Sequence, residues 1–152
     1  IAYIREFFVP QGILGETLET AVPWSKINQV KDEANKLLTE LHKKYDLPGK
    51  PFFCSRISKV YHTGICMYNT MGINVRGIKN PEKVFSDIEH KIRECFIKNG
   101  GSISHHHGVG KLRKDFMPET ISPGSIDVIQ GIKKSQDPNN IFGISNNIVN
   151  KK

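Results

Sequence analysis

The stretch that decides the fold is PFFCSRISKVYHTGICMYNTMGINV, residues 51–75. Two runs rich in β-branched and aromatic side chains, 52–62 and 65–75, are joined by a short segment that contains Gly64. This pattern predicts an antiparallel β-hairpin. Because side chains alternate across a strand, the second run should present two different faces. One face would carry Cys66, Tyr68 and Thr70, and the other Ile65, Met67 and Asn69.

A helix is expected on each side of the hairpin. Residues 26–45 place apolar side chains at helical spacing and charged ones on the other face, which is typical of a helix that packs on a sheet. Ser25 stands where a side chain would cap its start. After the hairpin, Asn80 and Pro81 predict a second helix, with a cap residue followed by proline at the first helical position. Its buried stripe should be Val84, Phe85, Ile88, Ile92 and Phe96.

Strands should complete this arrangement at both ends. Residues 15–22 alternate well enough for a strand, and residues 102–106 predict a short one after the second helix. The resulting order is that of a split β-α-β-β-α-β unit. The predicted fold class is therefore α+β, with a mainly antiparallel sheet covered by helices. Residues 125–135 predict a further C-terminal helix, with Ile126, Ile129 and Ile132 facing inward.

Composition limits the partners of the chain. Its 152 residues carry a net charge of +7, which suits nucleic acid, an anionic membrane surface or a phosphorylated small molecule. The basic residues are scattered and no zinc-finger spacing occurs, so nucleic acid is not expected as a partner. No apolar run reaches transmembrane length. The chain begins at Ile1 inside an apolar segment, and we expect it to be a piece of a longer protein.

The cysteines indicate a reducing compartment. Cys54, Cys66 and Cys95 are too few and too widely spaced for a disulfide framework. We interpret all three as small buried apolar residues. His42, on the first predicted helix, is expected at the surface rather than in a ligand site.

Residues 100–111, GGSISHHHGVGK, concentrate titratable groups on a backbone flanked by glycines. His105, His106 and His107 precede the basic residues that begin at Lys111, so an active-site loop that binds an anion is one interpretation. A solvated loop is a second. A metal site is a third, although adjacent residues of an extended strand point to opposite faces and no Cys or carboxylate stands at ligand spacing nearby.

Two other residues admit both structural and functional interpretations. Arg5 lies in an apolar helical segment, where its charge needs a partner. That partner is either Glu16 or Glu19 in an ion pair, or a carboxylate or phosphate of a ligand. Tyr68, on the second strand of the hairpin, is either a packed phenol with its hydroxyl bonded to a neighbour or a catalytic acid or base.

Four segments carry a specific resemblance: ETLETAVPWSKI, YHTGICMYN, GGSISHHHGVGKLRKDF and PNNIFG. Together they resemble the C-terminal part of the alkyldihydroxyacetonephosphate synthase family, flavoenzymes of ether-lipid synthesis of the vanillyl-alcohol oxidase type. The triple histidine followed by Gly-Val-Gly-Lys-Leu-Arg-Lys is characteristic of this family. D-lactate and glycolate dehydrogenases share only the generic ending around Asp137, Pro138 and Asn140.

The resemblance implies a domain organisation and a cofactor. Residues 1–14 would form a connecting helix that carries Arg5, and residues 15–104 a cap domain that closes over FAD. Residues 105–152 would hold the His loop and return to an N-terminal FAD-binding domain that lies outside this chain. The chain alone should then be inactive.

The resemblance also implies a reaction and its residues. The acyl group of acyl-dihydroxyacetone phosphate is exchanged for a long-chain fatty alcohol, without net oxidation. Tyr68 would be the acid/base, with His105, His106 and His107 as further catalytic residues. Arg5 would bind either the departing or arriving oxyanion or the phosphate, and no metal is implied. An activity-important segment near the C-terminus would fall on Ile144, Ser145, Asn146, Asn147 and Ile148.

The remaining expectations concern the partners of the protein, its location and two alternative functions. The family implies a peroxisomal location. The expected partners are the peroxisomal membrane surface and a second copy of the protein in a homodimer. The chain ends Asn150-Lys151-Lys152 rather than Ser-Lys-Leu, so an import signal is expected upstream. A flavin-dependent 2-hydroxy acid dehydrogenase is the alternative enzyme. A basic, His-rich module that binds metal or a phosphorylated lipid surface is the non-enzymatic one.

Overall fold

The computed structural model describes residues 2–146, with side chains from residue 5 onward. The chain divides into two compact units, Ile1–Ser102 and Ile103–Lys152. The elements of the first unit are α1 (Ala2–Phe8), η1 (Val9–Gln11), β1 (Ile13–Pro23), η2 (Trp24–Lys26), α2 (Ile27–Lys44), β2 (Phe52–Val60), β3 (Gly64–Asn74) and α3 (Pro81–Lys98). Those of the second unit are η3 (Lys114–Glu119) and α4 (Pro123–Gln136).

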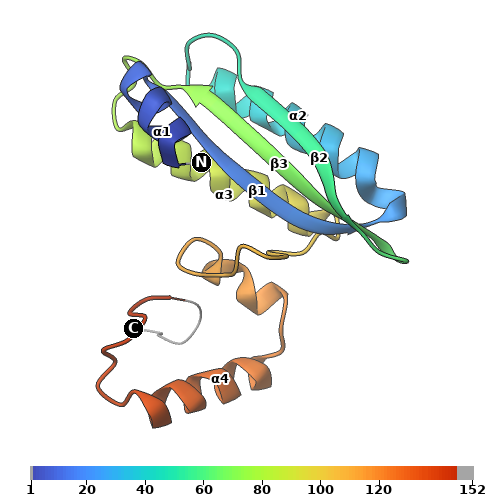
Figure 1. Cartoon of the computed structure of the whole chain (residues 1–152), viewed down its shortest axis with the longest axis vertical. Helices are drawn as coiled ribbons and strands as arrows, with labels where there is room; N and C mark the ends of the chain where they lie inside the picture. The colour runs from blue at the N-terminus through green and yellow to red at the C-terminus, as the bar shows by residue number, and fades with distance from the viewer. Residues whose placement is uncertain (1, 147–152) are drawn as a thin grey trace. The chain divides into compact units, whose positions relative to one another are not determined.

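The first unit is a three-stranded antiparallel sheet in the order β1-β3-β2. Figure 1 shows α2 and α3 lying side by side along one face of it. The predicted α+β class and the hairpin are confirmed, and β3 is the central strand. Its alternation is also as predicted, because Ile65, Met67, Met71 and Ile73 belong to the core beneath the helices.

The two long helices are built by their apolar stripes. Val30, Ala34 and Leu38 of α2 and Ile88 and Ile92 of α3 are fully buried, at the three- and four-residue spacing that aligns them on one helix face. Their caps differ from the expectation. Ser25 lies inside η2, so α2 begins after Lys26, which makes no side-chain cap bond. Asn80 precedes α3 in the left-handed conformation and makes no side-chain cap bond either.

Residues 102–106 do not form the strand that was predicted. Ser102 bonds to Ala21 of β1 much as a residue of a neighbouring strand would. Its amide donates to the Ala21 carbonyl at 3.0 Å, and its hydroxyl accepts from the Ala21 amide at 2.9 Å. The Thr20 hydroxyl donates to the Ser102 carbonyl at 2.9 Å. These three bonds attach Ser102 to one point of the β1 edge.

Three further expectations about burial are wrong. Cys54 is exposed, because it lies on the uncovered face of an edge strand, whereas Cys66 and Cys95 are buried as predicted. His42 is buried rather than at the surface. In α4, which has no buried residue, Ile132 is 60% exposed rather than turned inward.

The second unit has little regular structure outside α4. Ser122 caps α4 by accepting a hydrogen bond from the Ser125 amide at 3.2 Å, as expected of a serine before a helix. At the other end, Asp137 accepts from the amides of Ile141 and Phe142, both at 2.9 Å, and pairs with Lys133. None of the described helices is long and apolar enough to cross a membrane.

Candidate functional site

The face of the sheet turned away from α2 and α3 carries a polar row across all three strands, in which Arg56 is exposed, Tyr68 half-buried and Glu19 buried. Tyr68 on β3 is paired with Glu19 on β1 and with Arg56 on β2. Directly opposed residues of antiparallel strands place their side chains on the same face. Since Met67 faces the helices, Tyr68 and its two partners point to the face that α2 and α3 leave uncovered. We call this face the open face.

Arg56 and Tyr68 are in direct contact on the open face. The guanidinium carbon lies 4.7 Å from the centre of the Tyr68 ring, within the range of a cation–π interaction. Arg56 is exposed and makes no hydrogen bond or ion pair to any described residue. A guanidinium held by a cation–π contact makes no hydrogen bond through it, so its N–H donors stay available for a carboxylate or phosphate.

A β-bulge brings a second cation to the same face. The register of β2 against β3 shifts between Ile57 and Lys59, so that Lys59 is opposite Cys66 and Val60 is opposite Ile65. In an unbroken strand, residues at an odd separation such as 56 and 59 would face opposite ways. Because the bulge inserts one residue, Lys59 shares the open face with Arg56.

Beneath Tyr68, a buried polar network fixes the position of β3. Asn69 is fully buried, and its amide nitrogen donates to the Leu18 carbonyl of β1 at 3.3 Å. The Ser55 hydroxyl of β2 donates to the Asn69 amide oxygen at 2.6 Å. One side chain therefore ties together all three strands at the residue next to Tyr68, which holds the phenol on a rigid support.

Cys66, which shares this face of β3 with Tyr68 and Thr70, is not activated as a nucleophile. Burial raises the pKa of its thiol, and the charge of Glu19 acts in the same direction, against a hydrogen bond from Ser58. A raised pKa keeps the thiol protonated near neutral pH.

Arg5 is engaged by an acid. Its guanidinium bonds the Glu16 carboxylate at 2.7 Å, with the two side chains 53% and 23% exposed. The ion pair with Glu16 that the sequence offered as one alternative is therefore present. A role of Arg5 toward a substrate oxyanion stays a prediction.

The His run belongs to the second unit. The Nδ1 atoms of His105 and His106 are 3.0 Å apart, and the rings of His106 and His107 meet edge to face with centroids separated by 4.5 Å. The loop after them closes on buried Arg113, whose guanidinium donates to the Gly108 carbonyl at 2.9 Å. Because Tyr68 and the histidines lie in different units, their convergence on one pocket stays a prediction.

The predicted C-terminal segment is described only in part. Ile144 is exposed, Ser145 adopts a left-handed conformation, and the Asn146 amide donates to the Gly143 carbonyl at 2.9 Å. Asn147 and Ile148 lie outside the described residues.

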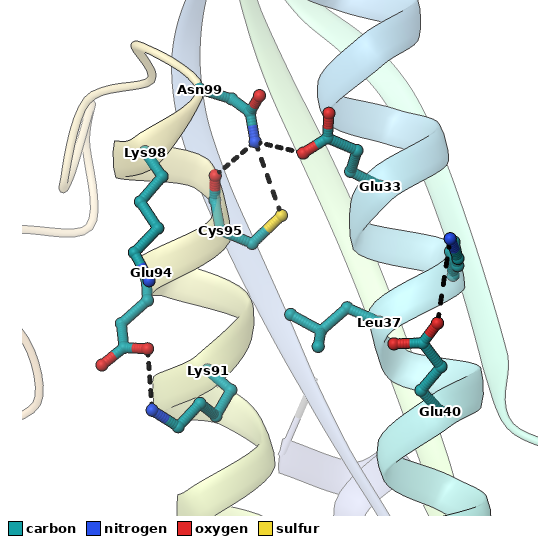
Figure 2. A pocket seen from close by; sticks show the side chains of 9 residues that line it. Glu33, Leu37, Glu40, Lys91, Glu94, Cys95, Lys98 and Asn99 are labelled. Carbon is teal, nitrogen blue, oxygen red and sulfur yellow. Dashed lines mark hydrogen bonds and ion pairs between the residues drawn. The ribbon is translucent and has the colours of Figure 1, made fainter.

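A groove of about 580 Å³ runs between α2 and α3, on the opposite side of the sheet from Tyr68. Asn99 bridges its walls by donating to Glu33 at 2.7 Å and to the Cys95 carbonyl at 2.9 Å. Both bonds are marked by dashed lines in Figure 2. Burial raises the pKa of Cys95, while hydrogen bonds from Gln29 and Asn99 lower that of Glu33. The lysines Lys36, Lys91 and Lys98 are matched by the glutamates Glu33, Glu40 and Glu94. The groove therefore has no excess charge with which to select an anion.

Arg56 and Lys59 are the site residues that sequence reasoning missed. The hairpin register could have placed Arg56 beside Tyr68, because both residues lie near the middle of their strands. Lys59 had no such signal, since simple alternation assigns it to the opposite face from Arg56.

Nearly the whole chain is similar to known proteins. The family described as FAD linked oxidases, C-terminal domain, matches residues 1–143. An alkyldihydroxyacetonephosphate synthase of Caenorhabditis elegans is 40% identical over 96% of this chain and 24% of its own length. A protein of Oryza sativa subsp. indica named "Probable D-2-hydroxyglutarate dehydrogenase, mitochondrial" is 27% identical over 91% of this chain and 27% of its own.

A solved structure of an alkyldihydroxyacetonephosphate synthase has the same fold. It superposes with a TM-score of 0.66 and 20% sequence identity, over 94% of this chain and 22% of that one. The chain thus spans about a quarter of the length of the proteins it matches.

Proposed function

The chain belongs to the family of FAD linked oxidases, C-terminal domain, and from this premise we propose that it is the substrate-binding part of an alkyldihydroxyacetonephosphate synthase. The observation that carries the proposal is the 40% identity to the synthase of C. elegans over 96% of the chain. The family is FAD-linked, so the expected cofactor is confirmed at that level.

The proposed reaction replaces the acyl group of acyl-dihydroxyacetone phosphate with a long-chain fatty alcohol. Loss of a carboxylate from this substrate requires a proton to move at the substrate carbon, which a positioned phenol can perform reversibly. Tyr68 has the support for this task, because the buried Asn69 network holds its strand in place. Arg5 and the histidines His105, His106 and His107 are proposed to bind and orient charged substrate groups.

The chemistry of the open face fits the surroundings of a flavin. It presents a phenol and two cations on a rigid sheet and leaves them uncovered by α2 and α3. When bound, FAD supplies an electrophilic ring system that the side chains of this chain lack. Tyr68 and Arg56 would line the substrate space next to that ring, while an N-terminal domain would hold the cofactor as the partner of this chain.

A 2-hydroxy acid dehydrogenase is the second candidate. The similarity to the rice protein named as a hydroxyglutarate dehydrogenase favours it, and a guanidinium beside a phenol would also suit a substrate carboxylate. The lower identity, 27% against 40%, places it behind the synthase.

The experiment that separates the two uses the full-length FAD-loaded enzyme. With acyl-dihydroxyacetone phosphate and labelled hexadecanol, the proposal expects labelled alkyl-dihydroxyacetone phosphate and release of fatty acid. Anaerobic addition of D-2-hydroxyglutarate or D-lactate should leave the flavin absorbance unchanged. Flavin bleaching by a hydroxy acid without ether product would assign the dehydrogenase activity instead.

The cellular setting is proposed on the family resemblance alone. A peroxisomal location would bring the enzyme to the membrane surface that delivers its long-chain substrates, with a homodimer as its assembly. Imaging of the tagged full-length protein against a peroxisomal marker tests the location.

A further inference from the structure

We propose that Arg56 and Lys59 form an anion-binding pair on the open face and hold the phosphate group of the three-carbon substrate beside Tyr68. The identity of that substrate rests on the proposed function. The anion-binding pair itself rests on the stacking of Arg56, the bulge in β2 and the distribution of acids around them.

Arg56 is pre-organised for binding an anion. Its guanidinium lies over the Tyr68 ring, and among residues 5–146 it makes no hydrogen bond or ion pair. Stacking restricts the side chain before a ligand arrives, so less rotamer entropy is lost when the N–H donors are engaged. Arg5 differs, because its guanidinium already forms an ion pair with Glu16 through Nη2.

The bulge in β2 places Lys59 on the same face of the sheet as Arg56. Only the register shift between Ile57 and Lys59 turns Lys59 toward the open face, two pairs along the ladder from the Arg56–Tyr68 pair. Bulges occur often next to active sites, where they redirect a side chain. Lys59 is exposed and has no ion pair with a described residue. A planar fork beside a mobile ammonium suits a phosphate dianion better than a single carboxylate.

The acid of the polar row lies on the other side of Tyr68 from Arg56. Glu19 is the carboxylate of the same row, but it lies on β1, and β3 separates it from Arg56 on β2. Two strand spacings amount to about 9–10 Å, which is too far for a direct ion pair between Glu19 and Arg56. The β2 side of Tyr68 is therefore the cationic side, and the phosphate belongs there.

The test measures binding directly, in the full-length FAD-loaded enzyme. Isothermal titration compares dihydroxyacetone phosphate with dihydroxyacetone, two probes that differ only in the phosphate. The variants are Arg56→Gln, Arg56→Lys and Lys59→Gln. Lys83→Gln, which removes an exposed charge from α3 on the covered side of the sheet, is the matched control. Palmitate is a third probe, because a carboxylate is the other oxyanion of the reaction.

We expect Arg56→Gln and Lys59→Gln each to weaken dihydroxyacetone phosphate binding about tenfold or more, as removal of a charge-assisted hydrogen bond does. Arg56→Lys should recover part of the loss, and Lys83→Gln should bind as the wild type does. Dihydroxyacetone and palmitate should be unaffected by all four substitutions. Unchanged affinity for dihydroxyacetone phosphate in both glutamine variants, or a loss confined to palmitate, would overturn the proposal.

The outcomes also separate this inference from the proposed function. If the enzyme forms no ether product but its affinity for dihydroxyacetone phosphate depends on Arg56 and Lys59, the function is wrong and the anion site stands. If it forms the product while both glutamine variants bind normally, the function stands and the anion site is wrong.

Discussion

The guanidinium carbon of Arg56 lies 4.7 Å from the centre of the Tyr68 ring, and the two residues oppose each other across the β2–β3 ladder. A cation and a phenol thus share one position on the uncovered face of a rigid sheet. The stacking fixes the side chain of Arg56, and the buried network around Asn69 fixes the strand that carries Tyr68. This is the part of the chain where positioned polar groups and an accessible surface coincide.

The Asn69 network should contribute measurably to stability. Asn69→Ala leaves the Ser55 hydroxyl and the Leu18 carbonyl without this partner, at a cost of about 1–3 kcal/mol for buried groups left unpaired. Urea unfolding followed by far-ultraviolet circular dichroism measures the change. The control is Thr39→Ala, since the exposed Thr39 hydroxyl bonds only the Asn35 carbonyl of its own helix. Equal stability of the two variants would show that the network contributes nothing.

The Arg5–Glu16 pair allows stability and function to be separated. Because both groups contact solvent, Arg5→Gln should change the free energy of unfolding by less than about 1 kcal/mol. If Arg5 also serves the substrate, the same variant should raise the KM for acyl-dihydroxyacetone phosphate in the full-length enzyme. Glu16→Gln, which breaks the same ion pair but keeps the guanidinium, is the matched control. A KM that rises equally in both variants would assign the effect to the lost pair.

Asp137 should make the loop after α4 sensitive to acid. The hydrogen bond from Lys133, followed by those from the Ile141 and Phe142 amides, lowers the pKa of its carboxyl from 3.8 to about 2. A depressed pKa stabilises the folded state above the unfolded-state value, and this contribution is lost as the pH falls from about 4 to about 2. Amide exchange at Ile141 and Phe142, compared between wild type and Asp137→Asn, measures it. The variant should show weak protection at every pH, whereas the wild type should lose protection only below about pH 4. The same pH profile in both proteins would contradict this assignment.

Local patterns predicted the elements of the first unit well. The three- and four-residue spacing of α2 and α3 and the alternation of β3 each follow from burying one face, so burial confirmed them. The strand predicted at residues 102–106 failed because its sequence carries no signal for where pairing stops: Ser102 bonds Ala21 of β1, yet residues 102–106 have no strand conformation. The predicted side-chain cap at Asn80 was wrong, because this residue precedes α3 in the left-handed conformation and its side chain makes no cap bond.

The site was predictable only in part. Tyr68 could be placed on a face from alternation alone, but its neighbours depend on register. The bulge that redirects Lys59 is a property of the paired strands and is invisible in one of them. Arg5 drew attention because it interrupts an apolar segment, yet the structure pairs it with Glu16. Arg56, in the hairpin, is exposed and has neither a hydrogen bond nor an ion pair with a described residue.

The most direct test of the account is the rate of ether-bond formation by the full-length FAD-loaded Tyr68→Phe variant. Removal of an acid/base group should reduce the rate by at least about a hundredfold, while flavin absorbance and melting temperature match those of the wild type. Tyr45→Phe is the control, because the Tyr45 hydroxyl makes only a long 3.4 Å bond to Asp87, away from the open face. Wild-type activity in Tyr68→Phe would contradict the central claim that the strand-mounted phenol moves the proton.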